Sequence, residues 1–284
     1  MESRMEKKDK FIDINKVIAS KDPRLLKWIP GFILRYVKRI VHEEEINGAL
    51  DRMGHLQGLP FIEAILKEFN ANIIVEGEAR IPRDGKAIIV ANHPLGGLDG
   101  LALMHVVGRV RNDIVFPVND LLLNIPNLRG LFIPVNKHGS NAANVRVFDE
   151  TFSGDKMVLY FPAGLCSRKQ KGVICDTEWK KSIITKARKY QRDIIPVHIS
   201  GRNSNFFYRL ANIRKSLRLK ANIEMLYLVD EMYKQRNQDI IITFGNPISW
   251  QTFTQERKDK TWAELLKDHV YRLESNQDAI FVNN

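Results

Sequence analysis

Short apolar runs alternate with stretches of helical periodicity along most of the chain. The apolar runs predict strands at residues 72–76, 86–91, 114–118, 131–135, 157–161, 194–198 and 240–244. Apolar positions at helical spacing predict helices at residues 12–19, 24–41, 43–54, 60–70, 99–108, 141–151, 176–190, 206–217 and 262–276. Strands that are apolar throughout and separated by helices are typical of parallel sheets buried on both faces. We therefore predict an α/β fold, with a largely parallel central sheet covered by helices on both faces.

The N-terminal part has a different pattern. Residues 1–70 are predicted to form a basic helical region, and residues 71–284 the α/β domain. Residues 24–41 contain five Lys or Arg, three aromatic residues and no acid, and Pro30-Gly31 should break them into two short amphipathic pieces. This composition suits a segment that lies in a membrane interface against anionic lipid. The alternative is an amphipathic helix that packs on its own domain.

The overall composition narrows the class of protein. The formal net charge is +11, yet no helix-turn-helix, zinc-finger, RNP or KH signature is present, so no nucleic-acid partner is expected. No signal peptide is expected, and no apolar run approaches the roughly 18 to 20 residues that span a bilayer. The two cysteines, Cys166 and Cys175, do not suggest a disulfide framework, and Cys166 is expected to be a buried structural residue. We expect a cytoplasmic protein that is peripheral on the inner face of the plasma membrane.

A histidine and a carboxylate are predicted to meet where a buried strand passes into a helix. The 86–91 strand stops at Asn92-His93, a loop rich in Pro and Gly follows, and Asp99 precedes the next helical pattern. α/β folds tend to place their chemistry at such crossovers. A carboxylate bound to one ring nitrogen fixes the imidazole tautomer, so the other nitrogen can take a proton from a hydroxyl. The alternative is that Asp99 only caps the helix and His93 is a structural loop residue.

The segment with Asn92-His93 and Asp99 is the first of four sequence blocks. The second, third and fourth lie at residues 130–137, 161–168 and 194–198, and the third begins Phe-Pro-Ala-Gly. Together with Asn92-His93 and Asp99, they resemble the signature of the glycerophosphate and lysophospholipid acyltransferase superfamily. The order and approximate spacing of all four blocks match, and the resemblance covers roughly residues 72–200. It implies that residues 71–284 are an acyltransferase domain and that the N-terminal helices contact the bilayer.

The chain departs from this signature in three places. Five residues separate the histidine from the aspartate where the family has four, and Gly96 and Gly97 in the gap are expected to absorb the extra one. Asn136-Lys137 stands where the second block ends in an arginine, and Ala163 where the third block has a glutamate. In the family those two positions help to hold a glycerol-phosphate acceptor. The resemblance therefore implies acyl transfer to a different acceptor.

The blocks at 92–100, 161–164 and 200–212 also resemble a bacterial subfamily, sometimes labelled hemolysin-like, that includes the O-acyltransferases of glycine and ornithine lipids. The resemblance implies transfer of a fatty acyl group from acyl-carrier protein or CoA to the 3-hydroxyl of an N-(3-hydroxyacyl) amino acid, a lyso-lipid acceptor. No cofactor besides that thioester, and no metal, is expected. The alternatives are a 1-acylglycerol-3-phosphate acyltransferase that makes phosphatidate, a hydrolase that releases fatty acid, and a non-catalytic lipid-binding protein.

These expectations assign a role to each candidate residue. His93 is the predicted general base, and Asp99 orients and stabilises the charged ring. Backbone N–H groups near Gly96, Gly97 or Gly164 are candidate donors to the oxyanion. The other predicted substrate-binding residues are Asn92, Asn136, Lys137, Ser167 and Arg168. Of these, Lys137, Ser167 and Arg168 are candidates for binding the acceptor head group or the phosphopantetheine phosphate of the donor.

A second basic stretch covers residues 202–220, which hold six Lys or Arg and no acid. Phe206, Leu210, Ile213 and Leu217 follow helical spacing within it. We predict a surface helix that docks by this apolar stripe. The functional alternative is a second contact with the membrane or with an acyl carrier.

Overall fold

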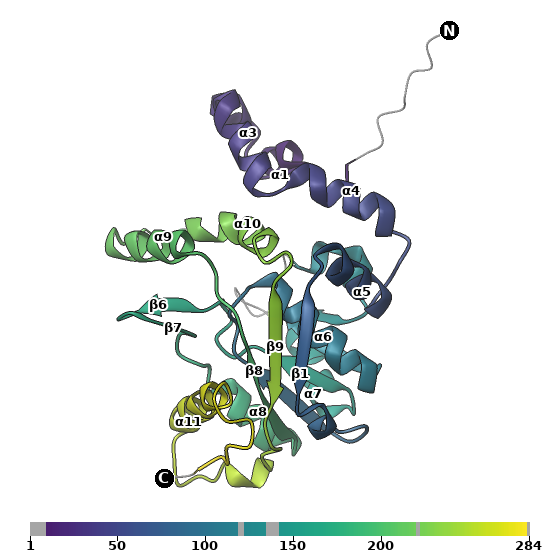
Figure 1. The fold of residues 1–284 in the computed structure, drawn as a ribbon, viewed down its shortest axis with the longest axis vertical. Coiled ribbons are helices and arrows are strands. Elements are labelled where there is room, and N and C mark those ends of the chain that lie inside the picture. Colours follow the sequence, from purple (N-terminus) through teal and green to yellow (C-terminus); the bar gives the residue numbers. More distant parts are fainter. Residues whose placement is uncertain (1–9, 119–121, 135–141, 220–221, 283–284) are drawn as a thin grey trace.

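A large twisted sheet forms the centre of the computed structural model, which describes residues 10–118, 122–134, 142–219 and 222–282 (Figure 1). Over these ranges, seven strands form the sheet in the order β1-β9-β8-β2-β5-β3-β4. They are β1 (Asn72–Glu76), β2 (Ala87–Ala91), β3 (Ile114–Val118), β4 (Phe132–Pro134), β5 (Met157–Tyr160), β8 (Asp193–Ile199) and β9 (Asp239–Phe244). Each of them overlaps a strand predicted from the sequence.

Neighbouring strands run parallel except at the junction of β8 and β9. Since β1 and β9 are parallel to each other, this pair runs opposite to the other five strands. The predicted α/β fold with a largely parallel sheet is confirmed. β2 lies in the middle of the sheet and is buried along its whole length.

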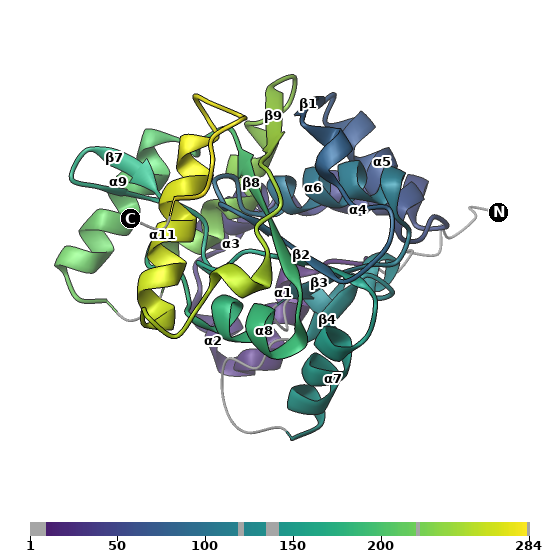
Figure 2. The same ribbon diagram turned by 90° about the horizontal axis from the view of Figure 1, so that it is seen from below.

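Helices cover both faces of the sheet. The helices of the described residues are α1 (Ile14–Lys21), α2 (Pro23–Trp28), α3 (Gly31–Ile40), α4 (Glu43–Met53), α5 (Leu59–Glu68), α6 (Gly97–Val110), α7 (Ala142–Ser153), α8 (Ser182–Tyr190), α9 (Asn205–Ser216), α10 (Leu228–Tyr233) and α11 (Asp259–Arg272). Ile89 of β2 belongs to the core formed with α5 and α6, whereas its neighbour Ile88 belongs to the core formed with α8 and α11. Figure 2 shows the two helix pairs on opposite sides of the sheet.

The N-terminal helices lie beyond one end of the sheet, above α9 and α10 (Figure 1). The break predicted at the Pro-Gly pair is present, because α2 ends at Trp28 and α3 begins at Gly31. The hydroxyl of Tyr36 in α3 lies 2.9 Å from that of Tyr227. Trp28 is 82% exposed and Phe32 is 65% exposed, so this segment does not bury its aromatic residues against its own domain.

The helix predicted at 176–190 is wrong at its N-terminal end, because α8 begins only at Ser182. The residues before it form an unpredicted hairpin of β6 (Arg168–Gln170) and β7 (Val173–Cys175). Asp176 and Trp179 follow this hairpin and bond to one another, and Asp176 also bonds to the loop after β2. These tertiary contacts prevail over the local helical pattern.

The docking face predicted for the second basic stretch is also wrong. α9 buries Phe207 and Tyr208, whereas Phe206, Ile213 and Leu217 of the predicted stripe are exposed. The helical period was correct, but the buried face is rotated. After α9 the chain continues through the unpredicted 3-10 turn η4 (Ile223–Tyr227) into α10. We call η4 and α10 together the cover segment.

Candidate active site

His93 and Asp99 lie together where β2 passes into α6. The Nδ1 atom of His93 is 3.0 Å from the Oδ2 atom of Asp99. The Asp99 side chain is completely buried, whereas that of His93 is 18% exposed. The contact predicted from the sequence is therefore present, and the catalytic roles of the two residues stay predictions.

The Asp99 carboxylate is held by backbone donors from its own loop. Oδ2 accepts hydrogen bonds from the N–H groups of Leu95 at 2.8 Å and Gly96 at 3.2 Å, and Oδ1 accepts one from Gly100 at 2.8 Å. Gly96 adopts a φ of +84°, a conformation that most other residues avoid. The glycine thus accommodates the extra residue of the loop while the histidine still reaches the carboxylate.

The imidazole ring of His93 is held on one face by an aromatic residue. Its centroid lies 4.3 Å from that of Phe161, with 21° between the ring planes. Phe161 is the first residue of the third sequence block and follows β5 directly. Because Nδ1 faces Asp99, Nε2 is the ring atom left for a substrate, and the described part of the chain offers it no hydrogen-bond partner.

The electrostatic surroundings of His93 favour its charged form. Burial lowers the pKa of the ring, but the charge of Asp99 and its hydrogen bond raise it, and the net pKa lies above the ordinary 6.5. The Asp176 carboxylate also raises this pKa, and the Arg168 guanidinium lowers it. A base in these surroundings is well suited to hold a proton taken from a hydroxyl group.

Two residues that flank the β6–β7 hairpin bind the backbone of His93. The N–H of Ser167 donates to the carbonyl oxygen of His93 at 2.7 Å, and the N–H of His93 donates to Oδ1 of Asp176 at 3.2 Å. The Ser167 hydroxyl donates to the same Asp176 oxygen at 2.6 Å. Sequence reasoning singled out Ser167 but missed Asp176, because the predicted helix at 176–190 hid its role. A predicted hairpin at 168–175 would have been the signal, since it places these two residues opposite each other.

Asn92, a predicted substrate-binding residue, joins two strands instead of pointing to a free site. Its Nδ2 donates to the carbonyl oxygen of Ile199 at 2.9 Å, and its Oδ1 accepts from the N–H of Ile199 at 2.7 Å. The side chain is buried. Asn92 thus continues the pairing of β2 with β8 and fixes the start of the loop that carries His93.

The three glycines predicted near the oxyanion differ in their backbone contacts. The N–H of Gly96 donates to Asp99, and that of Gly164 donates to the carbonyl oxygen of Phe161 at 3.1 Å. For the N–H of Gly97, the first residue of α6, the described residues provide no partner. Of the three glycines, Gly97 is therefore the one whose backbone N–H could donate a hydrogen bond to a substrate.

Arg168 is paired within the protein. Its Nη2 donates to Oε1 of the completely buried Glu224 at 3.1 Å, and Nε of Arg214 lies 2.8 Å from the other oxygen of Glu224. The guanidinium is thus part of an internal ion-pair cluster that ties the hairpin to the cover segment. Asn136 and Lys137 lie outside the described residues.

Cys166 is buried beside this cluster, as expected. Its Sγ accepts a hydrogen bond from Nη1 of Arg168 at 3.0 Å. Burial raises the pKa of the thiol, which disfavours the thiolate that a nucleophile requires.

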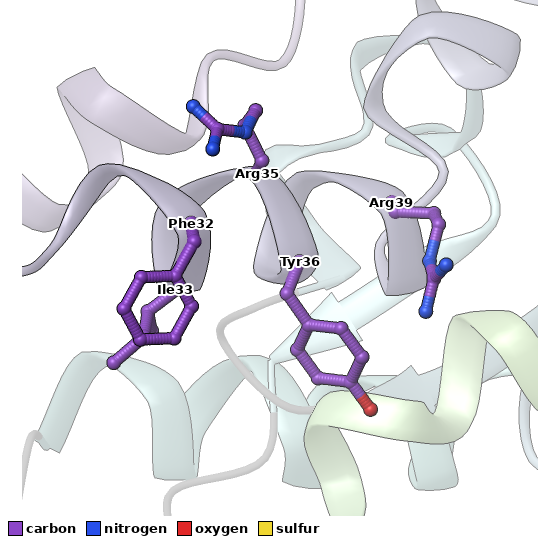
Figure 3. A pocket seen from close by; sticks show the side chains of 5 residues that line it. All are labelled: Phe32, Ile33, Arg35, Tyr36 and Arg39. Atoms are coloured by element: carbon purple, nitrogen blue, oxygen red, sulfur yellow. The ribbon is translucent and has the colours of Figure 1, made fainter.

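A separate hollow of about 480 Å³ lies along α3. Phe32, Ile33 and Tyr36 project from one side of the helix, whereas Arg35 projects from the opposite side and Arg39 lies at its end (Figure 3).

None of the helices in the described ranges combines the length and the apolar content that a bilayer span requires.

Comparison with known proteins identifies the family to which the chain belongs. The family described as Acyltransferase matches residues 16–280. A lyso-glycine lipid O-acyltransferase of Bacteroides thetaiotaomicron is 46% identical over 265 residues, which cover 93% of this chain and 97% of that protein. A lyso-glycine lipid O-acyltransferase of Phocaeicola vulgatus is 44% identical, with coverages of 93% and 95%.

Among solved structures, the 1-acyl-sn-glycerophosphate acyltransferase of Thermotoga maritima matches with a TM-score of 0.48 and 19% identity, over 86% of this chain and 94% of that one. The family match and the two bacterial relatives each span nearly the whole chain. The chain therefore belongs to the acyltransferase family, and it is an enzyme that transfers acyl groups.

Proposed function

We propose that this acyltransferase moves a fatty acyl group from a thioester to the 3-hydroxyl of an N-(3-hydroxyacyl) amino acid, in aminolipid synthesis. The proposal depends most on the His93–Asp99 pair, in which one ring nitrogen faces a buried carboxylate and the ring keeps an exposed edge. The names of the two relatives at 46% and 44% identity support N-(3-hydroxyacyl)glycine as the acceptor.

The proposed reaction needs no covalent enzyme intermediate. His93 Nε2 takes the proton of the acceptor hydroxyl while the acceptor oxygen attacks the thioester carbonyl carbon. The tetrahedral intermediate then collapses, the C–S bond breaks, and the leaving thiolate takes the proton from His93, which restores the neutral base. Asp99 keeps the ring oriented through both transfers and stabilises the imidazolium between them.

The tetrahedral oxyanion requires hydrogen-bond donors. The first turn of a helix leaves N–H groups without intrahelical partners, at the positive end of the helix dipole. We assign this role to the N–H of Gly97, with that of Leu98 as the second candidate, because α6 begins there beside Asp99. Such a donor typically contributes about 3 kcal/mol to transition-state stabilisation.

The surroundings of the third block support an acceptor without a glycerol-phosphate head group. Ala163, which stands where the family has a glutamate, is buried in the core beneath the sheet. Arg168 and Ser167 both use their side chains in internal contacts. Among the described residues, the third-block groups that would bind a phosphate head group are thus either replaced or already engaged, which argues against phosphatidate synthesis.

We further propose that α2 and α3 hold the enzyme against the inner face of the plasma membrane. Trp28 and Phe32 are exposed there, and Arg39 at the end of α3 can face anionic lipid. A peripheral position would give the active site access to a lipid acceptor and to acyl-carrier protein or acyl-CoA from the cytoplasm.

An acceptor competition assay tests this function. Purified enzyme would be incubated with N-(3-hydroxyacyl)glycine and 1-acylglycerol 3-phosphate together, with acyl-carrier protein or CoA as the carrier of the donor acyl group. Mass spectrometry should detect the diacylated glycine lipid as the main product. Preferential formation of phosphatidate, or release of free fatty acid alone, would contradict the proposal.

A further inference from the structure

Asp176 is a buried carboxylate that contacts the backbone of the proposed general base. It is 1% exposed, and it accepts hydrogen bonds from the hydroxyl of Ser167, the Nε1–H of Trp179 at 2.9 Å and the backbone N–H of His93. Its own N–H donates to the hydroxyl of Tyr271 at 2.7 Å. Both carboxylate oxygens are therefore occupied by donors.

The hairpin geometry explains how these groups meet. β6 and β7 pair antiparallel with Arg168 opposite Cys175, so Ser167, just before β6, comes to lie beside Asp176, just after β7. Ser167 binds the carbonyl oxygen of His93 and Asp176 binds its N–H. The peptide groups on both sides of the His93 Cα are thus held by the hairpin, while Asp99 holds the ring from α6.

We propose that Asp176 is a positioning residue for acyl transfer: it fixes the backbone of His93 and places a second negative charge near the ring. The inference rests on the proposed role of His93 as general base. Asp176 is then a second carboxylate, on a different element from Asp99, that acts on the position and the charge of the His93 ring.

The cost of burying this carboxylate supports a role beyond structure. Burial raises the pKa of Asp176, which means that its charged form is destabilised there. An amide side chain could accept the bonds from Ser167 and His93 without that desolvation cost, but its NH2 group could not accept the bond from Trp179. The carboxylate therefore satisfies all three donors, and it also places a buried negative charge that acts on a titratable group nearby.

His93 is the group that responds. The charged groups that act on its ring are Asp99 from α6 and Asp176 from the hairpin, which both raise its pKa, and Arg168, which lowers it. Arg168 is itself paired with Glu224. Removing the charge of Asp176 should therefore lower the pKa of His93, while the Asp99 contact remains.

The test is the substitution Asp176→Asn in the full-length enzyme, with the titration of the His93 imidazole followed by NMR. The expected result is a lower pKa of His93, an acid limb of the kcat profile that moves to lower pH, and a kcat reduced about 10-fold to 100-fold. The KM values for N-(3-hydroxyacyl)glycine and for the acyl thioester should change little, because Asp176 does not touch substrate. Since the asparagine NH2 would oppose the Trp179 N–H, the double variant Asp176→Asn, Trp179→Phe should fold better and keep the shift.

The control is Asp113→Asn, which removes a carboxylate paired with Arg111 at 2.6 Å and should leave the titration of His93 unchanged. If the single variant Asp176→Asn does not fold, the double variant Asp176→Asn, Trp179→Phe decides by the same readouts. A lower His93 pKa in the folded double variant supports the proposal, and a wild-type titration of His93 overturns it.

A folded Asp176→Asn enzyme with wild-type His93 titration would also overturn the inference. The NMR titration needs no substrate, so it does not depend on the identity of the acceptor. Full activity of the His93→Ala enzyme would instead contradict the proposed function, and the role of Asp176 would fall with it because that role rests on His93.

Discussion

The backbone of Gly96 lies directly against the side chain of Leu228. A Cβ added to Gly96 would come within 2.6 Å of Leu228 Cδ1. Gly96 belongs to the loop that carries His93, and Leu228 begins α10 of the cover segment. The position of the loop that carries His93 is therefore coupled to the cover segment by direct packing.

Gly96→Ala should lower kcat strongly, by about 100-fold or more, because a misplaced base costs rates of this order. Two effects act together: the side chain would be strained at φ +84°, and it would collide with Leu228. Steady-state transfer assays and thermal unfolding of the purified variant would measure the loss of activity and of stability separately.

Gly85→Ala is the matched control for this variant. Gly85 has a similar φ of +77°, but an added Cβ would meet nothing within 4 Å. It should show the cost of backbone strain alone, with near-normal kcat. The double variant Gly96→Ala, Leu228→Ala should recover part of the activity. If it recovers none, collision with the cover segment is not the cause.

The pH dependence of transfer should reveal the charge on His93. A general base must be neutral to accept a proton, so kcat/KM should rise with pH through the pKa of His93, which lies above 6.5. Asp99→Asn removes the main group that raises this pKa but leaves the burial that lowers it. The acid limb should therefore move to lower pH while kcat falls by a factor of about 10³ to 10⁴. An unchanged limb in the Asp99→Asn enzyme would argue against His93 as the titrating group.

Glu224 should be important for stability. It is completely buried between Arg168 and Arg214, and removing one member of a buried ion-pair cluster leaves charge uncompensated. Glu224→Gln should therefore lower the free energy of unfolding by roughly 3 to 5 kcal/mol in urea titrations. Glu68→Gln, which breaks an exposed pair with Arg52, should cost less than about 1 kcal/mol. Equal effects of the two substitutions would contradict this account.

His269 should make the protein sensitive to acid. It is completely buried in α11, and neither ring nitrogen has a partner among the described residues. Burial lowers its pKa to about 4, from an ordinary 6.5. In the window between these values the unfolded chain binds a proton that the folded protein does not, so stability falls as the pH drops through it.

His269→Leu should remove this dependence, which amounts to about 1.4 kcal/mol per pH unit within the window. Urea unfolding at several pH values between 4 and 7 would measure it, with wild type and variant compared at each pH. Parallel curves for the two proteins would show that acid acts through other groups.

The exposed aromatic residues of α2 and α3 should drive binding to vesicles with anionic lipid. Trp28→Ala and Phe32→Ala should each weaken binding about tenfold, because each removes a large apolar side chain that the bilayer would bury. Added salt should weaken binding by the wild type as well. Ile280→Ala removes a side chain that is 75% exposed near the C-terminus, and should have no effect. Equal loss in all three variants would exclude α2 and α3 as the specific contact.

Much of the fold could be predicted because its signals are local. The strands are short runs with apolar centres, and the central strand β2, buried on both faces of the sheet, is apolar throughout. The contact of His93 with Asp99 was also predictable, since the two residues are six positions apart and two glycines give the loop its freedom.

The rest of the site depends on contacts between distant parts of the chain. Asp176 bonds to a backbone group 83 residues away, and Asn92 to one 107 residues away. Neither contact leaves a periodic pattern, and the helical pattern after residue 176 pointed to the wrong structure. In α9 the pattern gave the correct period but not the buried face, because Phe207 and Tyr208 pack inward while Phe206 remains outside.

The most direct measurement of the central claim is the rate of acyl transfer by a folded His93→Ala enzyme. The substitution removes the ring that contacts Asp99, and the circular dichroism spectrum should stay that of the wild type. Transfer from an acyl thioester to N-(3-hydroxyacyl)glycine should fall by a factor of about 10² to 10⁴, the usual contribution of a general base. A variant that transfers acyl groups at the wild-type rate would contradict the assignment of His93 as the base.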